Sequence, residues 1–388
     1  MRLNLRLPEV KPGEFIVPRQ CPTPGCKGKH FYPRQKVNKN VVDAKHRQVE
    51  VWRYQCGTCG HTFRVYPQGV GKGQISHRVS GLAVMLYILG LSYGAVVIVL
   101  ESLGIGIGKT SVYRAVQAVA EKVPGMKQSH LLDGYRTGAV GADVTSVRCK
   151  GKWLPLGISV DAVQGLTLSI DSLPGEEAEQ LKAWLEPILE AVEADVLVSD
   201  DADAFKKVSD ETGRAHQVCK GHVGRNTDAL MEELSTLIQA GHDHSLDALQ
   251  VSAAQALADL RLLKQLIHAR QPTDQPILEQ LYLRYAAAHK PGKGRRFDIA
   301  YRMRNLFLDR WTLWPRLTFY RTWRDEHGNL NLDGTNNACE RSIGWWVKER
   351  YRSMRGYKRE QSALNVSRLI AHAGNHLALG LDLATLMA

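Results

Sequence analysis

Three acidic residues that lie far apart in the sequence could together hold divalent metal ions. Asp143 stands inside a strand-like segment, Asp200 directly follows the apolar run 196–198, and Glu340 lies in TNNACERS. A carboxylate at the centre of a sheet is costly without a cation, and two facing carboxylates repel unless a divalent ion lies between them. We therefore predict that Asp143, Asp200 and Glu340 bind Mg²⁺ or Mn²⁺, with Asp201 as the alternative to Asp200.

Four cysteines form a second group of possible metal ligands. They occur as two pairs, Cys21 with Cys26 in CPTPGC and Cys56 with Cys59 in CGTC, and each pair contains a glycine that lets the backbone turn toward the sulfurs. Four thiolates saturate a tetrahedral Zn²⁺ and leave no open position, so zinc bound here would be structural. The strand-like segment HRQVEVWRYQC between the pairs predicts a zinc ribbon, which either contacts DNA or only stabilises the fold.

The segment GIGIGKTSVY at 104–113 has the ending of a phosphate-binding loop but not its spacing. Such a loop needs a glycine at position 103, where Leu103 stands, and we predict no bound nucleotide. Helix-compatible segments on both sides instead predict a helix-turn-helix, with Thr110 or Ser111 as the N-cap of its second helix. An ordinary hairpin of core helices is the alternative. If the segment is a helix-turn-helix, its second helix presents four residues to DNA: Lys109, Ser111, Tyr113 and Arg114.

The segments around the acidic residues predict an α/β core. Three strand-like segments from residue 138 onward are followed by an amphipathic helix and by the strand that ends at Asp200, which is the element order of a ribonuclease-H-like fold. In that topology the strands of Asp143 and Asp200 are neighbours. Glu340 comes from a later helix. By itself it could merely satisfy the dipole of that helix, but together with the two aspartates it is better explained as a metal ligand.

These features predict a multidomain chain in which a zinc ribbon and a helix-turn-helix precede the ribonuclease-H-like core with its all-α insertion. The expected limits are a zinc ribbon at 1–70, a helix-turn-helix at 77–125, the first part of the core at 136–222, a helical insertion at 223–335 and the C-terminal helices of the core at 336–388.

Positive charge is concentrated at two places in the chain. The net charge is +12, and residues 1–80 hold 15 Lys and Arg against 4 Asp and Glu. Such clustering indicates a polyanionic partner, and nucleic acid fits best. The second concentration of positive charge, which we call the second basic segment, covers residues 341–360. It supplies further candidate DNA contacts: Arg341, Lys348, Arg350, Arg352 and Arg355. No apolar stretch is long enough to span a membrane and no signal-peptide core is evident, so we expect a cytoplasmic protein with no membrane partner.

Taken together, the ribbon, the helix-turn-helix, the α/β core and the segment TNNACER resemble DDE transposases of bacterial insertion sequences. Cys219 and His222 in HQVCKGHVGRN are similar to the C-x-x-H feature of mutator-like and related transposases. The resemblance implies that Asp143, Asp200 and Glu340 are the catalytic triad of a two-metal site that cleaves and joins DNA at terminal inverted repeats. It also implies a homodimer or larger assembly on DNA, in the bacterial nucleoid. For Cys219 and His222 we expect a structural role rather than a second zinc site.

Two other functions are compatible with the same motifs. One is a DNA-binding regulator with a ribbon and a helix-turn-helix, and the other is a ribonuclease-H-like nuclease that cuts without joining strands. The three intact acidic residues argue against the regulator.

Overall fold

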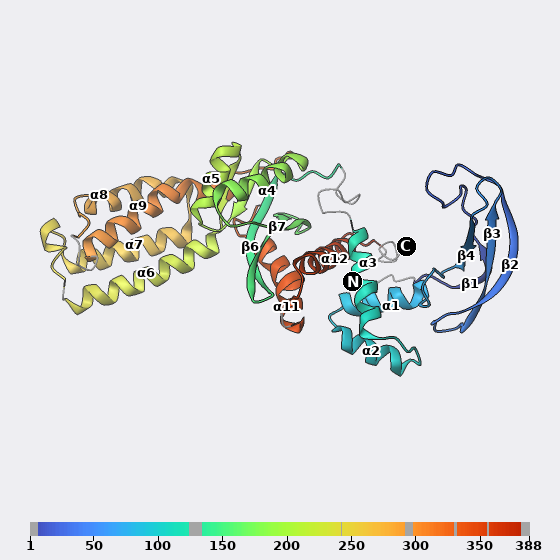
Figure 1. The fold of residues 1–388 in the computed structure, drawn as a ribbon. Helices are drawn as coiled ribbons and strands as arrows, with labels where there is room; N and C mark the ends of the chain where they lie inside the picture. Colours follow the sequence, from blue (N-terminus) through green and yellow to red (C-terminus); the bar gives the residue numbers. More distant parts are fainter. Residues whose placement is uncertain are drawn as a thin grey trace. The chain divides into compact units, whose positions relative to one another are not determined.

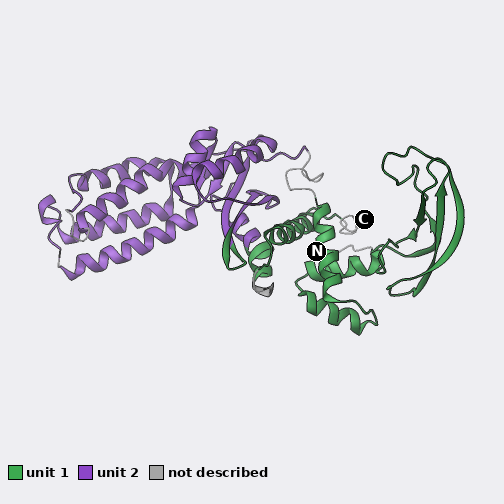
Figure 2. Cartoon of the chain, viewed as in Figure 1, with its two compact units in different colours: residues 1–129, 147–154, 344–388 green, residues 130–146, 155–343 purple. Residues whose placement is uncertain are grey.

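The computed structural model describes residues 7–123, 134–241, 243–291, 298–329, 332–354 and 357–381, apart from the side chains of 352–354. The chain divides into two compact units (Figure 2). Unit 1 contains residues 1–129, 147–154 and 344–388, and unit 2 contains residues 130–146 and 155–343. Within the described ranges, every helix is too short or too polar to traverse a lipid bilayer.

The first part of unit 1 is a small β structure (Figure 1). Strands β2 (Phe31–Asn40), β3 (Gln48–Cys56) and β4 (Thr62–Val65) form an antiparallel sheet, and β1 (Lys11–Phe15) pairs with β5 (Pro67–Gln68). Val49 and Val51 alternate with exposed residues along β3 and pack against Val10, Val41 and Val70. A core of five valines is small, so the sheet needs additional stabilisation, which the cysteine cluster described below can supply.

Most of the rest of unit 1 is helical. They are α1 (His77–Ile88), α2 (Tyr93–Ser102), α3 (Lys109–Lys122), α11 (Glu349–Met354) and α12 (Glu360–Ala378). Ser76 and Ser92 cap α1 and α2 through their side chains, whereas Gly108, rather than Thr110 or Ser111, is the N-cap of α3. Helix α12 packs on α3, where the side-chain amides of Asn365 and Gln117 form a buried hydrogen bond of 3.1 Å.

Unit 2 contains a mixed five-stranded sheet in the order β10-β9-β6-β7-β8. Strands β6 (Ala139–Cys149) and β7 (Lys152–Asp161) are joined by Lys150-Gly151, both with positive φ, and β7 pairs antiparallel with β8 (Thr167–Ser172). Strand β9 (Val196–Ser199) is parallel to both β6 and β10 (Ala215–Val218). Helices α4 (Ala178–Ala191) and α5 (Asp203–Thr212) contribute apolar faces to the core of this sheet.

A bundle of four helices follows β10 (Figure 1). It comprises α6 (Lys220–Ala240), α7 (Ala253–Ala269), α8 (Gln275–Tyr285) and α9 (Ile299–Thr318), which share a core that includes the fully buried Phe307 and Trp314. The chain then reaches α10 (Asn337–Ser342) and a π-helix (Ile343–Lys348). The protein is therefore a mixed α/β multidomain protein with a mixed sheet, as the sequence predicted at this coarse level.

Candidate metal and nucleic-acid sites

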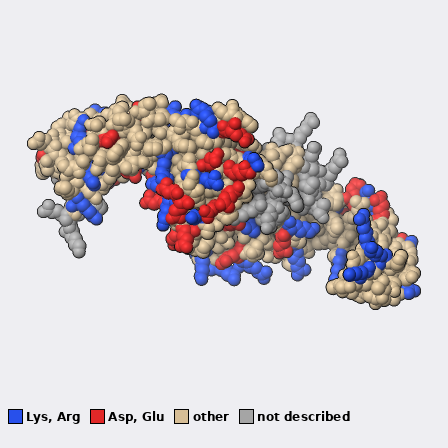
Figure 3. Space-filling model, turned by 90° about the horizontal axis from the view of Figure 1, so that it is seen from above, with Lys and Arg blue, Asp and Glu red and all other residues tan. Residues whose placement is uncertain are grey.

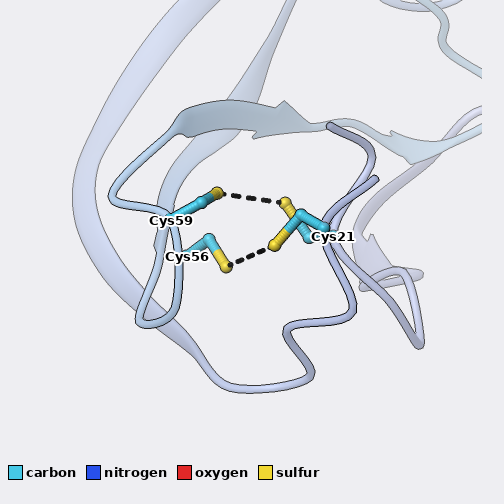
Figure 4. A group of neighbouring side chains, drawn as sticks. Cys21, Cys56 and Cys59 are labelled. Carbon is cyan, nitrogen blue, oxygen red and sulfur yellow. Dashed lines mark hydrogen bonds between the residues drawn. The ribbon is translucent and has the colours of Figure 1, made fainter. Parts of the chain in front are cut away.

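The four N-terminal cysteines form a cluster at one end of the β2-β3-β4 sheet, and Figure 4 shows Cys21, Cys56 and Cys59 turned toward a common centre. The Sγ atoms of Cys21 and Cys59 are 3.7 Å apart, and those of Cys26 and Cys56 are 3.9 Å apart. Sulfurs bound to one tetrahedral zinc ion at about 2.3 Å are about 3.8 Å apart, whereas a disulfide bond is only about 2 Å long. The cluster could therefore bind a metal ion such as zinc.

The environment of Cys56 favours its thiolate form. The backbone N–H of Cys59, helped by that of Thr58, lowers the pKa of the Cys56 thiol to about 6, against the opposing effect of desolvation. The backbone N–H of Gly28 lies 3.4 Å from the Sγ of Cys26. Backbone donors that point at the sulfurs are typical of loops that bind zinc, because a metal-bound cysteine is a thiolate.

Asp143 lies on the central strand β6 of the unit 2 sheet. The pKa of its carboxyl group is raised to about 6, mainly by burial and also by the charges of Asp200 and Glu340, while the backbone N–H of Val144 and the His222 side chain act in the opposite direction. Asp200 and Glu340 thus each lie close enough to Asp143 to affect its ionisation. Their repulsion is what a divalent cation would relieve, and oxygen ligands suit Mg²⁺ or Mn²⁺.

Asp200 and Asp201 have different surroundings. Asp200 follows the last residue of β9, directly beside β6, and its Oδ1 accepts the backbone N–H of Ala202 at 3.1 Å. The Oδ1 of Asp201 lies 2.9 Å from the Lys206 ammonium, and its Oδ2 lies 3.9 Å from the guanidinium of Arg310. Two cations therefore neutralise Asp201, which leaves Asp200 as the better metal ligand of the two.

Glu340 projects from the short helix α10, near the beginning of α6. The Nδ1 atom of His222, in the first turn of α6, lies 3.6 Å from Oε1 of Glu340. Ligand atoms of Cys219, His222 and Glu340 all lie within 4.8 Å of one another. Among the described residues, ligand atoms lie this close together in this trio and in the four cysteines. The ligand atoms of Asp143, Asp200 and Glu340 do not all lie within 4.8 Å of one another.

Asn336 positions α10 against the sheet, a role that sequence reasoning missed. It is the N-cap residue of α10, a position where an asparagine side chain commonly caps the helix, but its side chain makes no capping hydrogen bond. Instead its Nδ2 donates to the carbonyl of Ala142 at 2.9 Å, and its backbone N–H donates to the Sγ of Cys219 at 3.3 Å. A Cβ at Gly141 would approach the Oδ1 of Asn336 to 3.0 Å, so glycine on β6 permits this close packing.

Four candidate DNA contacts lie on α3. Lys109 and Arg114 are exposed, which suits contacts with an external partner. Ser111 and Tyr113 are half-buried, and the hydroxyl of Tyr113 is 3.1 Å from the Oγ of Ser362 on α12. Tyr113 therefore also contributes to packing within unit 1.

The second basic segment also contains both exposed and buried side chains. Arg341 and Lys348 are exposed. Arg350 differs from our expectation, because it is only 3% exposed. Its guanidinium donates to the carbonyl of Tyr87 and lies 4.0 Å from the centre of the Tyr87 ring, so in this conformation it stabilises the fold instead of facing a ligand. Arg355 and the side chain of Arg352 lie outside the described residues.

Comparison with protein-family models gives no match for this chain, and none of the curated proteins is significantly similar to it in sequence.

Proposed function

We propose that this protein is a DDE-type DNA transposase that cleaves and joins DNA strands at a two-metal site. The main support is that Asp200, after the neighbouring strand β9, and Glu340 on α10 both lie close enough to Asp143 on β6 to raise the pKa of its carboxyl group. On this proposal the five-stranded sheet with its helices is a ribonuclease-H-like core, and the bundle of α6 to α9 is its insertion. The cysteine cluster is the zinc site of a ribbon, and α2 with α3 is a helix-turn-helix.

Asp143, Asp200 and Glu340 would hold the divalent ions through their carboxylate oxygens. Bound there, Mg²⁺ or Mn²⁺ would activate the attacking oxygen and stabilise the leaving oxygen of an in-line phosphoryl transfer. Asp143 must first lose its proton, and its raised pKa of about 6 still leaves it mostly ionised at neutral pH. The ion pairs of Asp201 with Lys206 and Arg310 keep that carboxylate away from the metal ions.

DNA would contact exposed basic side chains in both units. Figure 3 shows Lys and Arg side chains grouped on the part of unit 1 that contains β2, β3 and β4. In unit 2, Arg341 directly follows the predicted metal ligand Glu340 and is exposed, so it can contact a phosphate beside the metal site. Trp345 is 68% exposed and is available to stack on an unpaired base, whereas Trp314 belongs to the core.

A strand-transfer assay tests this function. The full chain is mixed with a labelled inverted-repeat end taken from the DNA that flanks its gene, with Mg²⁺ or Mn²⁺ and with supercoiled plasmid. We expect joined products from the wild type and none from Asp143→Asn, which should still bind the end. Nicks without joining would identify a nuclease, and binding alone would identify a regulator. Joining at the full rate by Asp143→Asn would contradict the proposed site. A transposase that pairs two ends also predicts a dimer or larger complex on DNA.

A further inference from the structure

The trio of Cys219, His222 and Glu340 contains a thiol and an imidazole, which are not the ligands that magnesium prefers. It brings one sulfur, one imidazole nitrogen and one carboxylate within 4.8 Å of one another. Magnesium prefers oxygen ligands in octahedral geometry, whereas thiolate and imidazole together favour zinc or a chemically similar ion. We propose that Cys219, His222 and Glu340 form a zinc site separate from the cysteine cluster of unit 1.

The distance between His222 and Glu340 fits a single tetrahedral ion, and the Sγ of Cys219 lies within 4.8 Å of both ligand atoms. Nitrogen, oxygen and sulfur ligands at their usual distances from Zn²⁺ are about 3.3–3.6 Å apart. The observed separation between the Nδ1 of His222 and Oε1 of Glu340 is 3.6 Å. Three protein ligands leave a fourth position on the ion for water, which is the arrangement of zinc sites that remain open.

The backbone around Cys219 holds its side chain in place. Its N–H donates to the carbonyl of Ser199 at 2.8 Å, and the N–H of Lys220 donates to the carbonyl of Gly334 at 2.9 Å. The Cys219 side chain is 1% exposed, and its Sγ accepts the N–H of Asn336 at 3.3 Å. Hydrogen bonds of this kind orient metal ligands and tune their basicity. Cys219 is therefore fixed before any ion binds.

His222 has a potential metal-binding atom that nothing else satisfies. Its Nδ1 atom is buried and has no hydrogen-bond partner. A buried polar atom without a partner is costly, and a metal ion in front of Nδ1 would remove that cost. A simple ion pair between His222 and Glu340 would also use Nδ1, but it would not need a thiol. Cys219 is therefore the residue that distinguishes a zinc site from an ion pair.

Glu340 belongs both to this trio and to the proposed catalytic carboxylates, so zinc at the trio would tie α10 to the start of α6. Zinc binding itself does not depend on DNA chemistry. The two proposals can therefore fail separately: zinc content is measured without DNA, and Asp143→Asn, which removes no ligand of the trio, should keep its zinc whatever its effect on strand transfer.

The test is the zinc content of the purified full chain after equilibration with Zn²⁺ and removal of the excess, measured by mass spectrometry of the metal. We expect two zinc ions per wild-type chain, and one in Cys219→Ser and in His222→Ala. Cys56→Ser should lose the other zinc ion. The matched control is Cys149→Ser, since Cys149 is also buried but stands outside both groups, and this variant should keep two.

Circular dichroism identifies a variant that has not folded. If Cys219→Ser fails to fold, His222→Ala, which alters a less buried side chain, decides the outcome. A second readout is Co²⁺ substitution, where loss of Cys219 should remove one set of the sulfur-to-cobalt absorption bands. One zinc per wild-type chain, or a second zinc that survives both Cys219→Ser and His222→Ala, overturns the proposal.

Discussion

The Oδ1 atom of Asp201 lies 2.9 Å from the Nζ atom of Lys206, while the adjacent Asp200 accepts a backbone N–H from Ala202. Two neighbouring aspartates at the end of one strand therefore have different roles. Asp201 is neutralised by Lys206 and by the buried Arg310, whereas Asp200 adds its negative charge to that of Asp143.

Asp200→Asn should consequently lower activity, whereas Asp201→Asn should mainly lower stability. On the proposed function, loss of Asp200 removes a metal ligand, and we expect strand transfer to fall by about 10²–10⁴-fold, because bound metal contributes several kcal/mol to transition-state stabilisation. Asp201→Asn should retain most of its activity but lose about 1–3 kcal/mol of stability, because Arg310 would keep only part of its partners. Strand-transfer rates and thermal unfolding of both variants measure this difference. Equal activity losses would argue against assigning the metal to Asp200.

Removing zinc from the cysteine cluster should unfold the β structure of unit 1. Its valine core is small, and zinc binding to four thiolates contributes about 10 kcal/mol or more in comparable small domains. In Cys56→Ser, or with a chelator, we expect cleavage by trypsin within residues 7–70 to become at least about tenfold faster. Limited proteolysis with peptide identification measures this rate, and Cys149→Ser is the control. Unchanged protection after zinc removal would show that the sheet is stable without the metal.

His216 should make the protein less stable in mild acid. Burial, together with the charges of Arg316 and Lys206, lowers its pKa to about 3, compared with 6.5 for an exposed histidine. The unfolded chain therefore binds a proton that the folded chain does not, so this contribution to stability is complete above pH 6.5 and decreases as the pH falls toward 3. The expected loss is about 1.4 kcal/mol per pH unit.

Thermal unfolding of the wild type and of His216→Gln at pH 7.5 and pH 5 measures this effect. The variant should lose less stability between the two pH values than the wild type does. Some dependence should remain in the variant, because burial also lowers the pKa of His372, to about 4. The same loss in both proteins would mean that another group is responsible.

Two arginines of the second basic segment should respond differently to replacement. Arg350→Met removes the hydrogen bond to the Tyr87 carbonyl and the contact with its ring, so we expect a loss of about 2–4 kcal/mol of stability. Arg341→Ala alters an exposed side chain and should leave stability unchanged. On the proposed function it should weaken DNA binding. It should also reduce the slope of log affinity against log salt concentration by about 1, which corresponds to one lost phosphate contact. Thermal unfolding and DNA-binding titrations at several salt concentrations separate the two effects, and a stable Arg350→Met protein would contradict the first.

Local patterns in the sequence predicted the features that depend on neighbouring residues. The spacing of Cys21, Cys26, Cys56 and Cys59 indicated a metal site, and the four sulfurs do form one cluster. Apolar runs indicated the segments that become β6, β9 and α4. The mixed α/β class and the cysteine cluster are thus confirmed. The ribonuclease-H-like core, the helix-turn-helix, the domain limits and the roles of the acidic residues remain predictions.

Features that depend on distant contacts were not predictable in this way. Nothing in the local sequence of Arg350 distinguishes it from its exposed neighbours, because its burial results from packing against Tyr87. Asparagine is common at helix N-caps, yet the side chain of Asn336 donates to the carbonyl of Ala142, on a strand far away in the sequence. The closeness of His222 and Glu340 likewise follows from the positions of α6 and α10, although the C-x-x-H spacing had already singled out His222.

The packing of α12 on α1 and α3 has a consequence for biosynthesis. Helices α1, α2 and α3 are translated before α12. Gln117 can therefore meet its partner Asn365, and Met85 can meet Ala373, only when α12 has left the ribosome. Until then the nascent chain exposes an incomplete core, which chaperones that bind apolar segments would be expected to cover. The helices that we propose to bind DNA would thus complete their core only after the whole of unit 2 has been synthesised.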